Sequence, residues 1–382
     1  MPEIEKYLLS PEAIVLTGMR RTGKTTVLNY FYHRLQTDNK LYLDLENPVN
    51  RMYFEELNYA KIKTTFEALG LDLARKSYVF LDEIQLSQNL PSAVKYLLDH
   101  YDIKFFLTGS ASFYIKNHFT ESLSGRKIIF ELYPLTFREF LRFKDSALKI
   151  PDNSGNVTRP IFDTFYPLYE EYISHGGFPG VVLKSGVEAK RRALEDIFTS
   201  FFQMEIVQLS DFRKNDIIRD LILLLMQRIG SKLDIQKVSR ELGVSRTTLN
   251  EYIAFLEGTY FIKRLRPFTQ GRDYEIRKAP KIYLCDTGLA NHFARVAPGA
   301  LFENCVLQNL VPRGEINYYQ KKSGVEIDFI LNKAVAYEVK TSPDKTDANK
   351  LAHLAREILL DDFKIVSGNF SQLENVIYGF MI

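Results

Sequence analysis

The stretch Gly18-Met19-Arg20-Arg21-Thr22-Gly23-Lys24-Thr25 decides the fold of the first third of the chain. It has the spacing G-x-x-x-x-G-K-[ST], and it joins the apolar run Ala13–Thr17 to a helical pattern. A loop in this position binds phosphate, because its glycines let backbone N–H groups surround the oxygens and the helix N-terminus adds partial positive charge. The alternative is a chance match in a glycine-containing turn. The spacing and its context predict a phosphate-binding loop (P-loop).

The residues of this loop have predicted roles toward a nucleotide. Lys24 is expected to reach the β- and γ-phosphates and to be catalytic, and the Thr25 hydroxyl is expected to bind Mg²⁺. The candidate cofactor-binding residues of the loop and the first helical turn are Gly18, Arg20, Arg21, Thr22, Gly23, Lys24, Thr25 and Thr26.

The pattern around the loop is typical of a parallel sheet with helices on both faces. Short apolar runs alternate with helical patterns such as Thr25–Leu35 and Ser92–His100, which is how parallel strands and their connecting helices follow one another. The predicted fold class is α/β, with a P-loop sheet in residues 1–140. The expected strands are Ala13–Thr17, Lys40–Leu45, Ser77–Asp82, Lys104–Thr108 and Lys127–Glu131.

Two acidic residues follow the third expected strand. Asp82 and Glu83 end the apolar run Tyr78–Leu81, and ligands of α/β sheets bind at the carboxyl ends of the strands. We expect Asp82 to hold Mg²⁺ through water and Glu83 to orient or deprotonate the attacking water. A solvated strand end is the alternative.

Two further residues are candidates for contact with the γ-phosphate. Ser110 follows the fourth expected strand, and the alternative there is an ordinary turn. Arg126 precedes the fifth strand, and it could reach the phosphate in the same chain or in a neighbouring subunit. The alternative is a surface arginine.

Several of these runs together resemble a prokaryotic family of AAA-type ATPases whose C-terminal domain has no assigned function. The resemblance extends over the whole chain and implies that the nucleotide is ATP. It is carried by Gly18–Thr25, Asp82-Glu83-Ile84-Gln85, Leu107-Thr108-Gly109-Ser110, Glu131-Leu132-Tyr133-Pro134-Leu135 and Gly176-Gly177-Phe178-Pro179.

A helix-turn-helix pattern occupies residues 234–256, with Gly243 at the turn and Ser245 as the N-cap of the second helix. In a DNA-binding version the start of the second helix faces the major groove. Two β-like runs follow and suggest a winged variant, with a basic cluster between Lys263 and Lys281. The alternative is a module that only packs domains together. The candidate DNA contacts are Arg246, Thr247 and Asn250 on the helix and Arg272, Arg277 and Lys278 on the wing.

The C-terminal region has an Asp, a spacer and then Glu-x-Lys: Asp328, Glu338 and Lys340. This resembles the PD-(D/E)XK core of restriction endonucleases and junction resolvases, which implies two Mg²⁺-binding acids and a catalytic lysine that stabilises the attacking water or the developing charge. Glu303 fits the additional acid that the family places on the preceding helix. The alternative is an inactive binding module in which these groups form salt bridges.

The loop between the two strands decides whether these acids meet. Side chains alternate along a strand, so a two-residue loop at Asn332-Lys333 leaves Asp328 and Glu338 on opposite faces. A three-residue loop, Asn332 to Ala334, places them opposite each other with Cβ atoms about 5 Å apart. We expect the three-residue loop or an equivalent bulge.

Composition sets limits on function. The chain has 382 residues, 46% of them hydrophobic and 25% charged, as in an ordinary globular protein. The net charge of +3 does not by itself indicate nucleic-acid binding. Cys285 and Cys305 are expected to be buried thiols. No apolar run approaches the ~20 residues that span a bilayer, and a signal-peptide core is lacking, so we expect a cytoplasmic protein without a membrane role.

These observations predict four regions. The ATPase domain in 1–140 is followed by a helical segment in 141–230, a winged helix in 231–292 and a small α/β restriction-endonuclease-like domain in 293–382. The leading hypothesis is a protein that binds and hydrolyses ATP with Mg²⁺ and acts on DNA or another nucleic acid, with a nuclease-like C-terminal domain. The alternative is a nucleotide-switched DNA- or protein-binding regulator without nuclease activity. A protein partner or self-association stays open.

Overall fold

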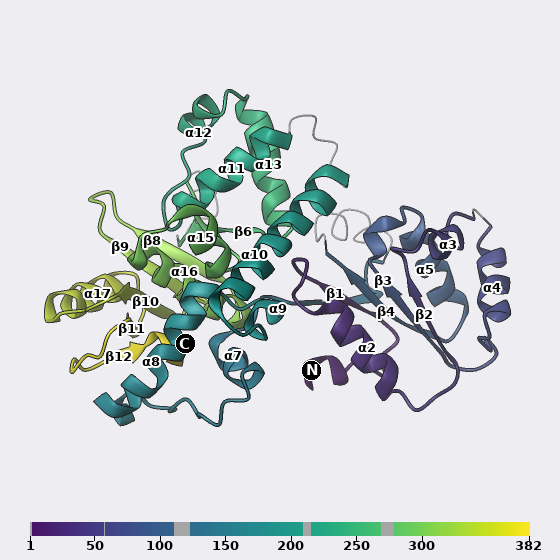
Figure 1. Ribbon diagram of the computed structural model, residues 1–382, viewed down its shortest axis with the longest axis horizontal. Coiled ribbons are helices and arrows are strands. Elements are labelled where there is room, and N and C mark those ends of the chain that lie inside the picture. Colours follow the sequence, from purple (N-terminus) through teal and green to yellow (C-terminus); the bar gives the residue numbers. More distant parts are fainter. Residues whose placement is uncertain (1, 57, 111–122, 209–214, 269–278) are drawn as a thin grey trace. The chain divides into compact units, whose positions relative to one another are not determined.

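The computed structural model describes residues 2–56, 58–110, 123–208, 215–268 and 279–382 (Figure 1). The chain divides into two compact units. The first unit comprises Met1–Tyr133 with Gly258–Tyr260, and the second comprises Pro134–Glu257 with Phe261–Ile382. The division falls before the predicted boundary at residue 140 because Leu135 already donates a backbone hydrogen bond of 2.7 Å to Gly177 O of the second unit. The further division of the second unit into three modules stays a prediction.

The first unit is built on a five-stranded parallel sheet with strand order β2-β3-β4-β1-β5. This confirms the predicted α/β P-loop fold class. Its strands are β1 (Ala13–Thr17), β2 (Lys40–Asp44), β3 (Ser77–Asp82), β4 (Ile103–Gly109) and β5 (Lys127–Glu131). Its described helices are α1 (Pro2–Glu5), α2 (Lys24–Arg34), α3 (Pro48–Met52), α4 (Tyr59–Ala68) and α5 (Leu90–His100).

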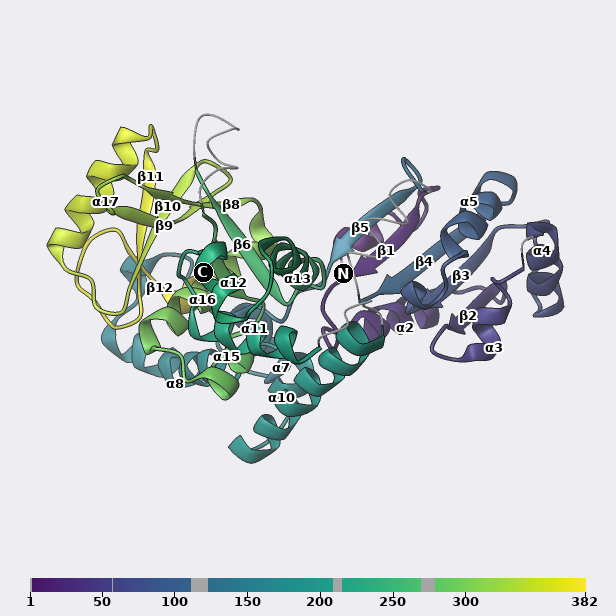
Figure 2. The same cartoon turned by 90° about the horizontal axis from the view of Figure 1, so that it is seen from above.

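Helices cover both faces of this sheet because neighbouring side chains of each strand point to opposite faces. Val15 packs in one core with α4 and α5, and its neighbours Ile14 and Leu16 pack in the other with α2. Figure 2 shows α2 and α5 on opposite sides of the strands. Strands buried on both faces are typical of parallel sheets.

The second unit begins with helices and continues into a mixed sheet (Figure 1). The helix-turn-helix prediction is confirmed in geometry: Gly243 adopts φ 64° at the turn, and Ser245 Oγ accepts a hydrogen bond of 3.0 Å from Thr248 N. The described helices are α7 (Phe137–Phe143), α8 (Arg159–His175), α9 (Pro179–Val182), α10 (Val187–Phe201), α11 (Asn215–Gln227), α12 (Ile235–Glu241), α13 (Arg246–Gly258), α15 (Thr287–Ala294), α16 (Pro298–Leu310) and α17 (Lys345–Glu357).

The sheet of the second unit has seven strands in the order β12-β11-β10-β9-β8-β6-β7. β6 and β7 form the antiparallel pair after the helix-turn-helix, and β6 also pairs in parallel with β8. The two β-like runs and the C-terminal strands therefore share one sheet. The strands are β6 (Ile262–Pro267), β7 (Lys281–Leu284), β8 (Ile316–Gln320), β9 (Glu326–Leu331), β10 (Val335–Lys340), β11 (Asp362–Ser367) and β12 (Val376–Tyr378).

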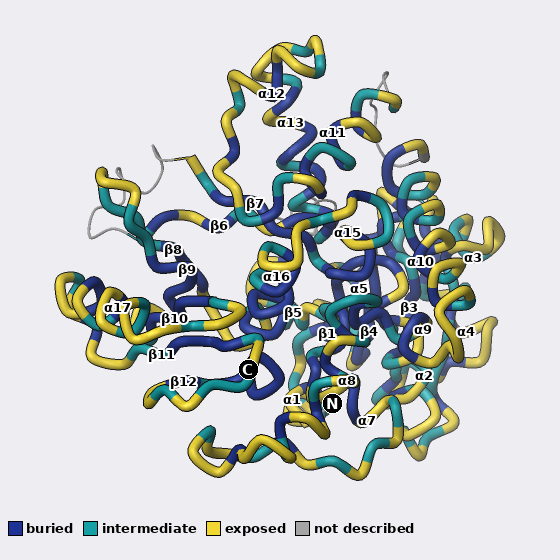
Figure 3. The backbone as a smooth tube through the Cα atoms, turned by 60° about the vertical axis from the view of Figure 1, so that its left-hand side comes forward, coloured by how far each residue is buried: buried dark blue, intermediate teal, exposed yellow. Residues whose placement is uncertain are grey.

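Most strand positions of both units are buried, whereas many loop positions are exposed (Figure 3). Cys305 is buried, as expected, but Cys285 is only partly so. Cys285 lies between the end of β7 and Asp286, which is the N-cap residue of helix α15. Within the described ranges no helix combines the length and the apolar character needed to cross a bilayer.

Candidate functional site

The P-loop connects β1 to α2 and has the backbone that its glycines predict. Gly18 and Gly23 have φ of 150° and 97°, and Arg21 between them has φ 67°. A Cβ at Gly18 would lie 2.1 Å from Leu132 O, so only glycine fits there. Leu132 N also donates to Thr17 O at 2.7 Å, so the residues after β5 hold the start of the loop.

Lys24 is buried at the first turn of α2 with its ammonium group on the loop. Its Nζ donates to Gly18 O at 3.0 Å and to Met19 O at 2.9 Å. Thr22 Oγ1 also donates to Met19 O, at 2.8 Å, which stiffens the middle of the loop. Thr25 and Thr26 are exposed on the first turn of the helix, as is Arg21 on the loop. The roles predicted for these residues toward a nucleotide stay predictions.

The P-loop shares its edge of the sheet with Asp82. Parallel pairing sets Leu81 of β3 level with Leu107 of β4 and Leu107 level with Val15 of β1, so all three strands end together. Asp82 is buried there and accepts hydrogen bonds from Thr108 Oγ1 and from Tyr42 Oη. Burial and the charge of Asp82 raise the pKa of Tyr42, so the phenol stays a donor that orients the carboxylate.

Glu83 sits at the start of a short turn in a left-handed conformation, with φ 55°. Its carboxylate accepts a hydrogen bond from Gln85 Nε2, which also donates to Ser110 Oγ at 2.9 Å. The Arg20 guanidinium lies 3.8 Å from Glu83 Oε1. The structure thus brings together Arg20, Glu83 and Ser110, which the sequence placed far apart, and adds Gln85 as the group that orients Glu83.

Arg126 lies at the opposite end of the sheet, which contradicts a contact with the γ-phosphate in the same chain. Its backbone carbonyl accepts from Ala13 N at 2.8 Å, at the amino end of β1. The P-loop begins five residues further along that strand, about 16 Å away at ~3.3 Å per residue. Its guanidinium pairs instead with Asp99, at 2.6 Å. Contact with a neighbouring subunit stays a prediction.

In the second unit, the β9–β10 hairpin has the expected register. Leu331 pairs with Val335 and Phe329 with Tyr337, so the next pair along is Asp328 with Glu338. The connection is the three-residue loop, Asn332 to Ala334, and its first two residues have φ of 51° and 57°. The predicted three-residue loop is confirmed, and its register, extended by one pair, places Asp328 level with Glu338.

The two acids are fixed in different ways. Asp328 Oδ2 accepts a hydrogen bond of 2.8 Å from Val339 N. Glu338 Oε1 accepts from Lys340 Nζ at 2.8 Å. Glu338 Oε2 is buried and has no hydrogen-bond partner among the described residues. A buried carboxylate oxygen without a partner is costly, so this atom has the capacity for one more ligand.

Lys281, which the sequence analysis named only as one end of a basic cluster, lies among the acids. It begins β7, and its side chain is 4% exposed. Its Nζ is 3.1 Å from Glu326, 3.8 Å from Asp328 and 3.9 Å from Glu303. Among the described residues, no three acidic, His or Cys side chains are arranged to hold a metal ion. The predicted convergence of Glu303, Asp328, Glu338 and Lys340 on one cation is therefore not formed in this structure, because an ammonium group lies beside Glu303 and Asp328.

The acids of this group have the raised pKa values expected of buried, neighbouring carboxylates. Burial first, and then the charge of Asp328, raises the pKa of Glu303 to about 7 and that of Glu338 to about 7. Burial also raises the pKa of Asp328. Burial lowers the pKa of Lys281, but Glu303, Asp328 and Glu326 more than offset this and leave it raised. Lys281 therefore stays charged.

These residues fit a divalent cation in part. Mg²⁺ prefers carboxylate oxygens and keeps several waters, so one or two carboxylates suffice. Asp328 and Glu338 supply two, and the unpartnered Glu338 Oε2 is a free ligand atom. Glu303 fits less well, because Tyr283 Oη donates to it at 2.5 Å.

The predicted DNA contacts of α13 are Arg246, Thr247 and Asn250, and all three are exposed. Val238, Leu249 and Ile253 are buried behind them, whereas Leu242 and Val244 are half-buried. The wing residues Arg272, Arg277 and Lys278 lie outside the described residues.

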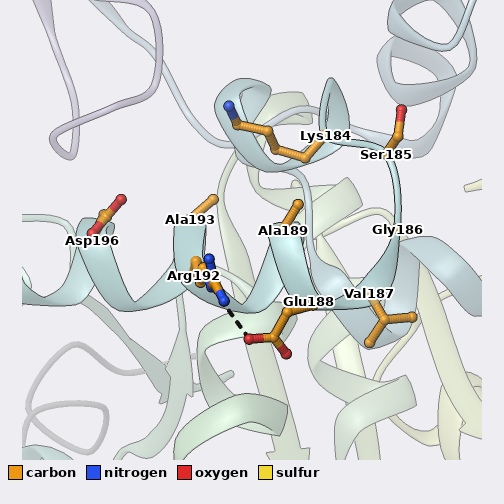
Figure 4. A pocket seen from close by; sticks show the side chains of 9 residues that line it. All are labelled: Lys184, Ser185, Gly186, Val187, Glu188, Ala189, Arg192, Ala193 and Asp196. Carbon is orange, nitrogen blue, oxygen red and sulfur yellow. Dashed lines mark hydrogen bonds and ion pairs between the residues drawn. The ribbon is translucent and has the colours of Figure 1, made fainter.

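A surface hollow of about 570 Å³ lies at the start of α10 (Figure 4). It is lined by one continuous segment, residues 184–196, in which Arg192 pairs with Glu188 at 3.3 Å. It contains none of the predicted site residues.

Gln85, Thr108 and Lys281 belong to the two sites but were not predicted as site residues, and the sequence gives a different signal for each. Gln85 belongs to the run Asp82-Glu83-Ile84-Gln85, and Thr108 to the run that ends in Ser110, so both could have been named as partners. Lys281 gives one weak signal, a lysine at the start of an otherwise apolar strand run.

Residues 10–141 match a protein family described as an AAA domain. Together with the P-loop geometry, this defines the first unit as an AAA-type P-loop ATPase domain, which is a nucleotide-binding class. Residues 166–299 and 298–370 match two families described as domains of unknown function, DUF8612 and DUF4143. The second of these contains Glu303, Asp328, Glu338 and Lys340.

Several uncharacterised proteins are similar to most of the chain. One from Haemophilus influenzae is 28% identical, over 87% of this chain and 84% of its own length. MJ1544 from Methanocaldococcus jannaschii is 25% identical, over 98% and 86%. Rv2008c from Mycobacterium tuberculosis is 22% identical, over 94% and 76%.

Solved structures show weaker likeness. The ORC1 protein of Aeropyrum pernix in complex with DNA is 14% identical, covers 82% of this chain and 92% of its own, and has a TM-score of 0.35. The ORC2 protein of the same organism, with ADPNP and ADP, is 14% identical over 73% and 86%, with a TM-score of 0.29. Likeness at this level assigns no function.

Proposed function

We propose that this protein hydrolyses ATP and uses the nucleotide cycle to act on nucleic acid through a Mg²⁺-dependent, nuclease-like site in the second unit. One observation carries the proposal: the β9–β10 register sets Asp328 opposite Glu338, and Lys340 is hydrogen-bonded to Glu338. Two acids and a lysine in this arrangement are the groups that metal-dependent phosphodiester cleavage needs.

In the first unit, the residues at the carboxyl edge of the sheet each have a proposed role in ATP binding or hydrolysis. Lys24 and the P-loop N–H groups bind the phosphates, and Thr25 and Asp82 hold the Mg²⁺ of the nucleotide. Glu83 orients the attacking water and takes its proton. The hydrogen bonds from Gln85 and from Thr108 to these acids support this assignment, because they fix the two carboxylates before a nucleotide binds.

In the second unit, α13 provides the surface for nucleic acid. Arg246 and Asn250 are exposed on its first turns, and Ser245 caps the helix. Arginine and asparagine at this position can contact base edges or phosphates. A Mg²⁺ held by Asp328 and Glu338 would lower the pKa of a bound water and so supply the nucleophile. Lys340 then stabilises negative charge next to Glu338.

A second candidate function is an ATP-switched binding protein that does not cleave. Lys281 favours it, because a buried ammonium within 4 Å of three carboxylates satisfies their charges without a metal ion. The acids are then a salt-bridge network that stabilises a binding module.

A cleavage assay separates the two. Single-stranded, duplex and branched DNA and RNA are incubated with Mg²⁺ or Mn²⁺, with and without ATP. The nuclease proposal expects metal-dependent cleavage that Asp328→Ala abolishes and that Glu83→Gln alters only when ATP is present. Binding of these substrates without cleavage supports the second candidate. Cleavage by Asp328→Ala at the wild-type rate would show that the activity comes from another site.

A further inference from the structure

The carboxylates of the second unit divide into two halves that share Asp328. One half surrounds the Lys281 ammonium with Glu303, Glu326 and Asp328. The other half consists of Asp328 and Glu338 with Lys340. We call these the lysine half and the open half.

The lysine half has the contacts of a built cation site whose cation is an ammonium group. Besides its three acids, Lys281 Nζ lies 5.5 Å from the centre of the Tyr318 ring, within the range of a cation–π contact. Tyr283 Oη donates to Glu303 at 2.5 Å and Gln320 Nε2 donates to Glu326 at 3.1 Å. Hydrogen bonds from Tyr283 and Gln320 thus hold Glu303 and Glu326 in place.

In the open half, one oxygen of Glu338 has a cation beside it and the other has no hydrogen-bond partner among the described residues. Lys340 pairs with Glu338 Oε1, but Glu338 Oε2 is buried and has no hydrogen-bond partner in the described part of the chain. Glu338 as a whole is 4% exposed. A carboxylate so deeply buried requires a partner for each oxygen, so the unsatisfied atom indicates where a ligand belongs.

The charges of the two halves set the number of ions that can enter. A bound divalent cation favours the ionised form of each carboxylate. With all four acids ionised, the acids and the two lysines paired with them leave two formal negative charges. One divalent cation balances these, whereas a second would bring excess positive charge into a buried site. Removal of the Lys281 charge changes that count.

We propose that Lys281 occupies the place of a second metal ion, so that the cluster accepts one divalent cation, held by Asp328 and Glu338 and not by Glu303. This rests on the proposed function, because it specifies the metal site of that function. It makes Lys281 the residue that sets the number of ions, and it assigns Glu303 and Glu326 as counter-ions of that lysine. The Lys281 ammonium and the divalent cation then each offset part of the repulsion between the acids.

Mn²⁺ binding to the full-length, nucleotide-free protein tests this. Free Mn²⁺ is measured by electron paramagnetic resonance, and ions that Asp328→Ala abolishes are counted as cluster ions. The wild type is expected to hold one cluster ion. Lys281→Met is expected to hold two, or to hold one at least 10-fold more tightly. Lys281→Arg, which keeps the charge, and Lys190→Met, which removes a buried lysine paired with Glu171 elsewhere in the unit, are expected to match the wild type.

The effect of Mn²⁺ on the melting temperature is a second measurement. It can be made even if Lys281→Met does not fold without metal. Lys281→Met leaves buried acids uncompensated, so Mn²⁺ is expected to raise its melting temperature more than that of the wild type, or to restore folding if it does not fold alone. An equal ion count, affinity and melting shift in wild type and Lys281→Met would overturn this inference and leave the metal site standing. No ion sensitive to Asp328→Ala in either protein would overturn the proposed metal site itself.

Discussion

At the scale of single residues, the side chains of the first unit differ in the role that we propose for them toward a nucleotide. Lys24 lies on the P-loop, whereas Glu83 lies beyond the end of β3 and is held by Gln85. The sequence predicted both positions, because a strand followed by a glycine loop or by acids places these side chains at the carboxyl end of the sheet. It did not predict Tyr42, which reaches Asp82 from a neighbouring strand, since nothing local distinguishes that tyrosine.

Substitution of Lys24 and Glu83 should separate binding from hydrolysis. Lys24→Ala removes a charged contact to the phosphates and is expected to abolish or strongly weaken ATP binding. Glu83→Gln keeps the shape but not the base, so ATP should bind normally while hydrolysis slows about 10²-fold or more. Isothermal titration and a phosphate-release assay measure the two effects. Hydrolysis by Glu83→Gln at the wild-type rate would refute the assignment of Glu83.

Two glycines of the second unit make opposite predictions for stability. Gly176 has φ +78°, and a Cβ there would lie 2.0 Å from the Asp286 carboxylate. Gly176→Ala is expected to lower the free energy of unfolding by about 2–4 kcal/mol, through backbone strain and displacement of a buried acid. Gly180 is the matched control, because a Cβ there meets nothing within 4 Å, and Gly180→Ala should change stability by less than about 1 kcal/mol. Equal denaturation midpoints for the two variants would contradict this.

At the scale of elements, the β9–β10 hairpin shows what a sequence can and cannot fix. Strand alternation reduced the choice to two loop lengths, and the requirement that both acids share a face selected the three-residue loop that the structure has. Lys281 could not be found in this way, because it comes from β7, which pairs with β6 and not with β9 or β10. Only the three-dimensional sheet brings it to the acids.

The raised pKa values of Glu303 on α16 and Glu338 on β10 predict how stability depends on pH. The pKa of Glu303 and Glu338 is about 7 in the folded chain, against an ordinary value of 4.5. The folded state therefore binds more protons than the unfolded state between these values, and stability should fall as pH rises from about 4.5 through 7. The expected loss for the metal-free protein is about 1–3 kcal/mol. Urea unfolding at several pH values measures it.

Substitution of Glu338 tests the origin of that slope. Glu338→Gln removes a titrating group but keeps its size, so the slope should become shallower and the protein more stable at pH 8. Glu188→Gln on α10 is the control, because Glu188 is 68% exposed and lies outside the carboxylate cluster. Stability of the wild type that rises between pH 5 and 7.5 would show that the carboxylates are not buried in their acid form.

Helix α13 makes a separate prediction about nucleic acid. If Arg246 contacts DNA, Arg246→Glu should weaken binding, and the dependence of affinity on salt should become less steep. Arg192→Glu is the control, because Arg192 is also an exposed arginine but lies on α10, where it pairs with Glu188. Fluorescence anisotropy over a range of salt concentrations measures both. Unchanged affinity for Arg246→Glu would favour a packing role for the helix-turn-helix.

At the scale of the whole molecule, the chain joins an AAA-type ATPase unit to a unit with a mixed sheet. The connection after β5 is short: Leu132 contacts the P-loop glycine Gly18, and Leu135, three residues later, is hydrogen-bonded to Gly177. A change at the P-loop thus has a direct covalent route to the second unit. The sequence predicted an ATPase region that ends at residue 140, and the AAA-domain match ends at residue 141.

The central claim is that the nucleotide in the first unit controls action on nucleic acid by the second. Its most direct test is the affinity of Glu83→Gln for duplex DNA, measured by anisotropy with saturating ATP and Mg²⁺ and without nucleotide. We predict a difference of at least about 5-fold, since coupling between sites is typically 1–3 kcal/mol, and no response to ATP when Lys24→Ala is added. Equal affinities with and without ATP, or no DNA binding at low salt, would contradict the account.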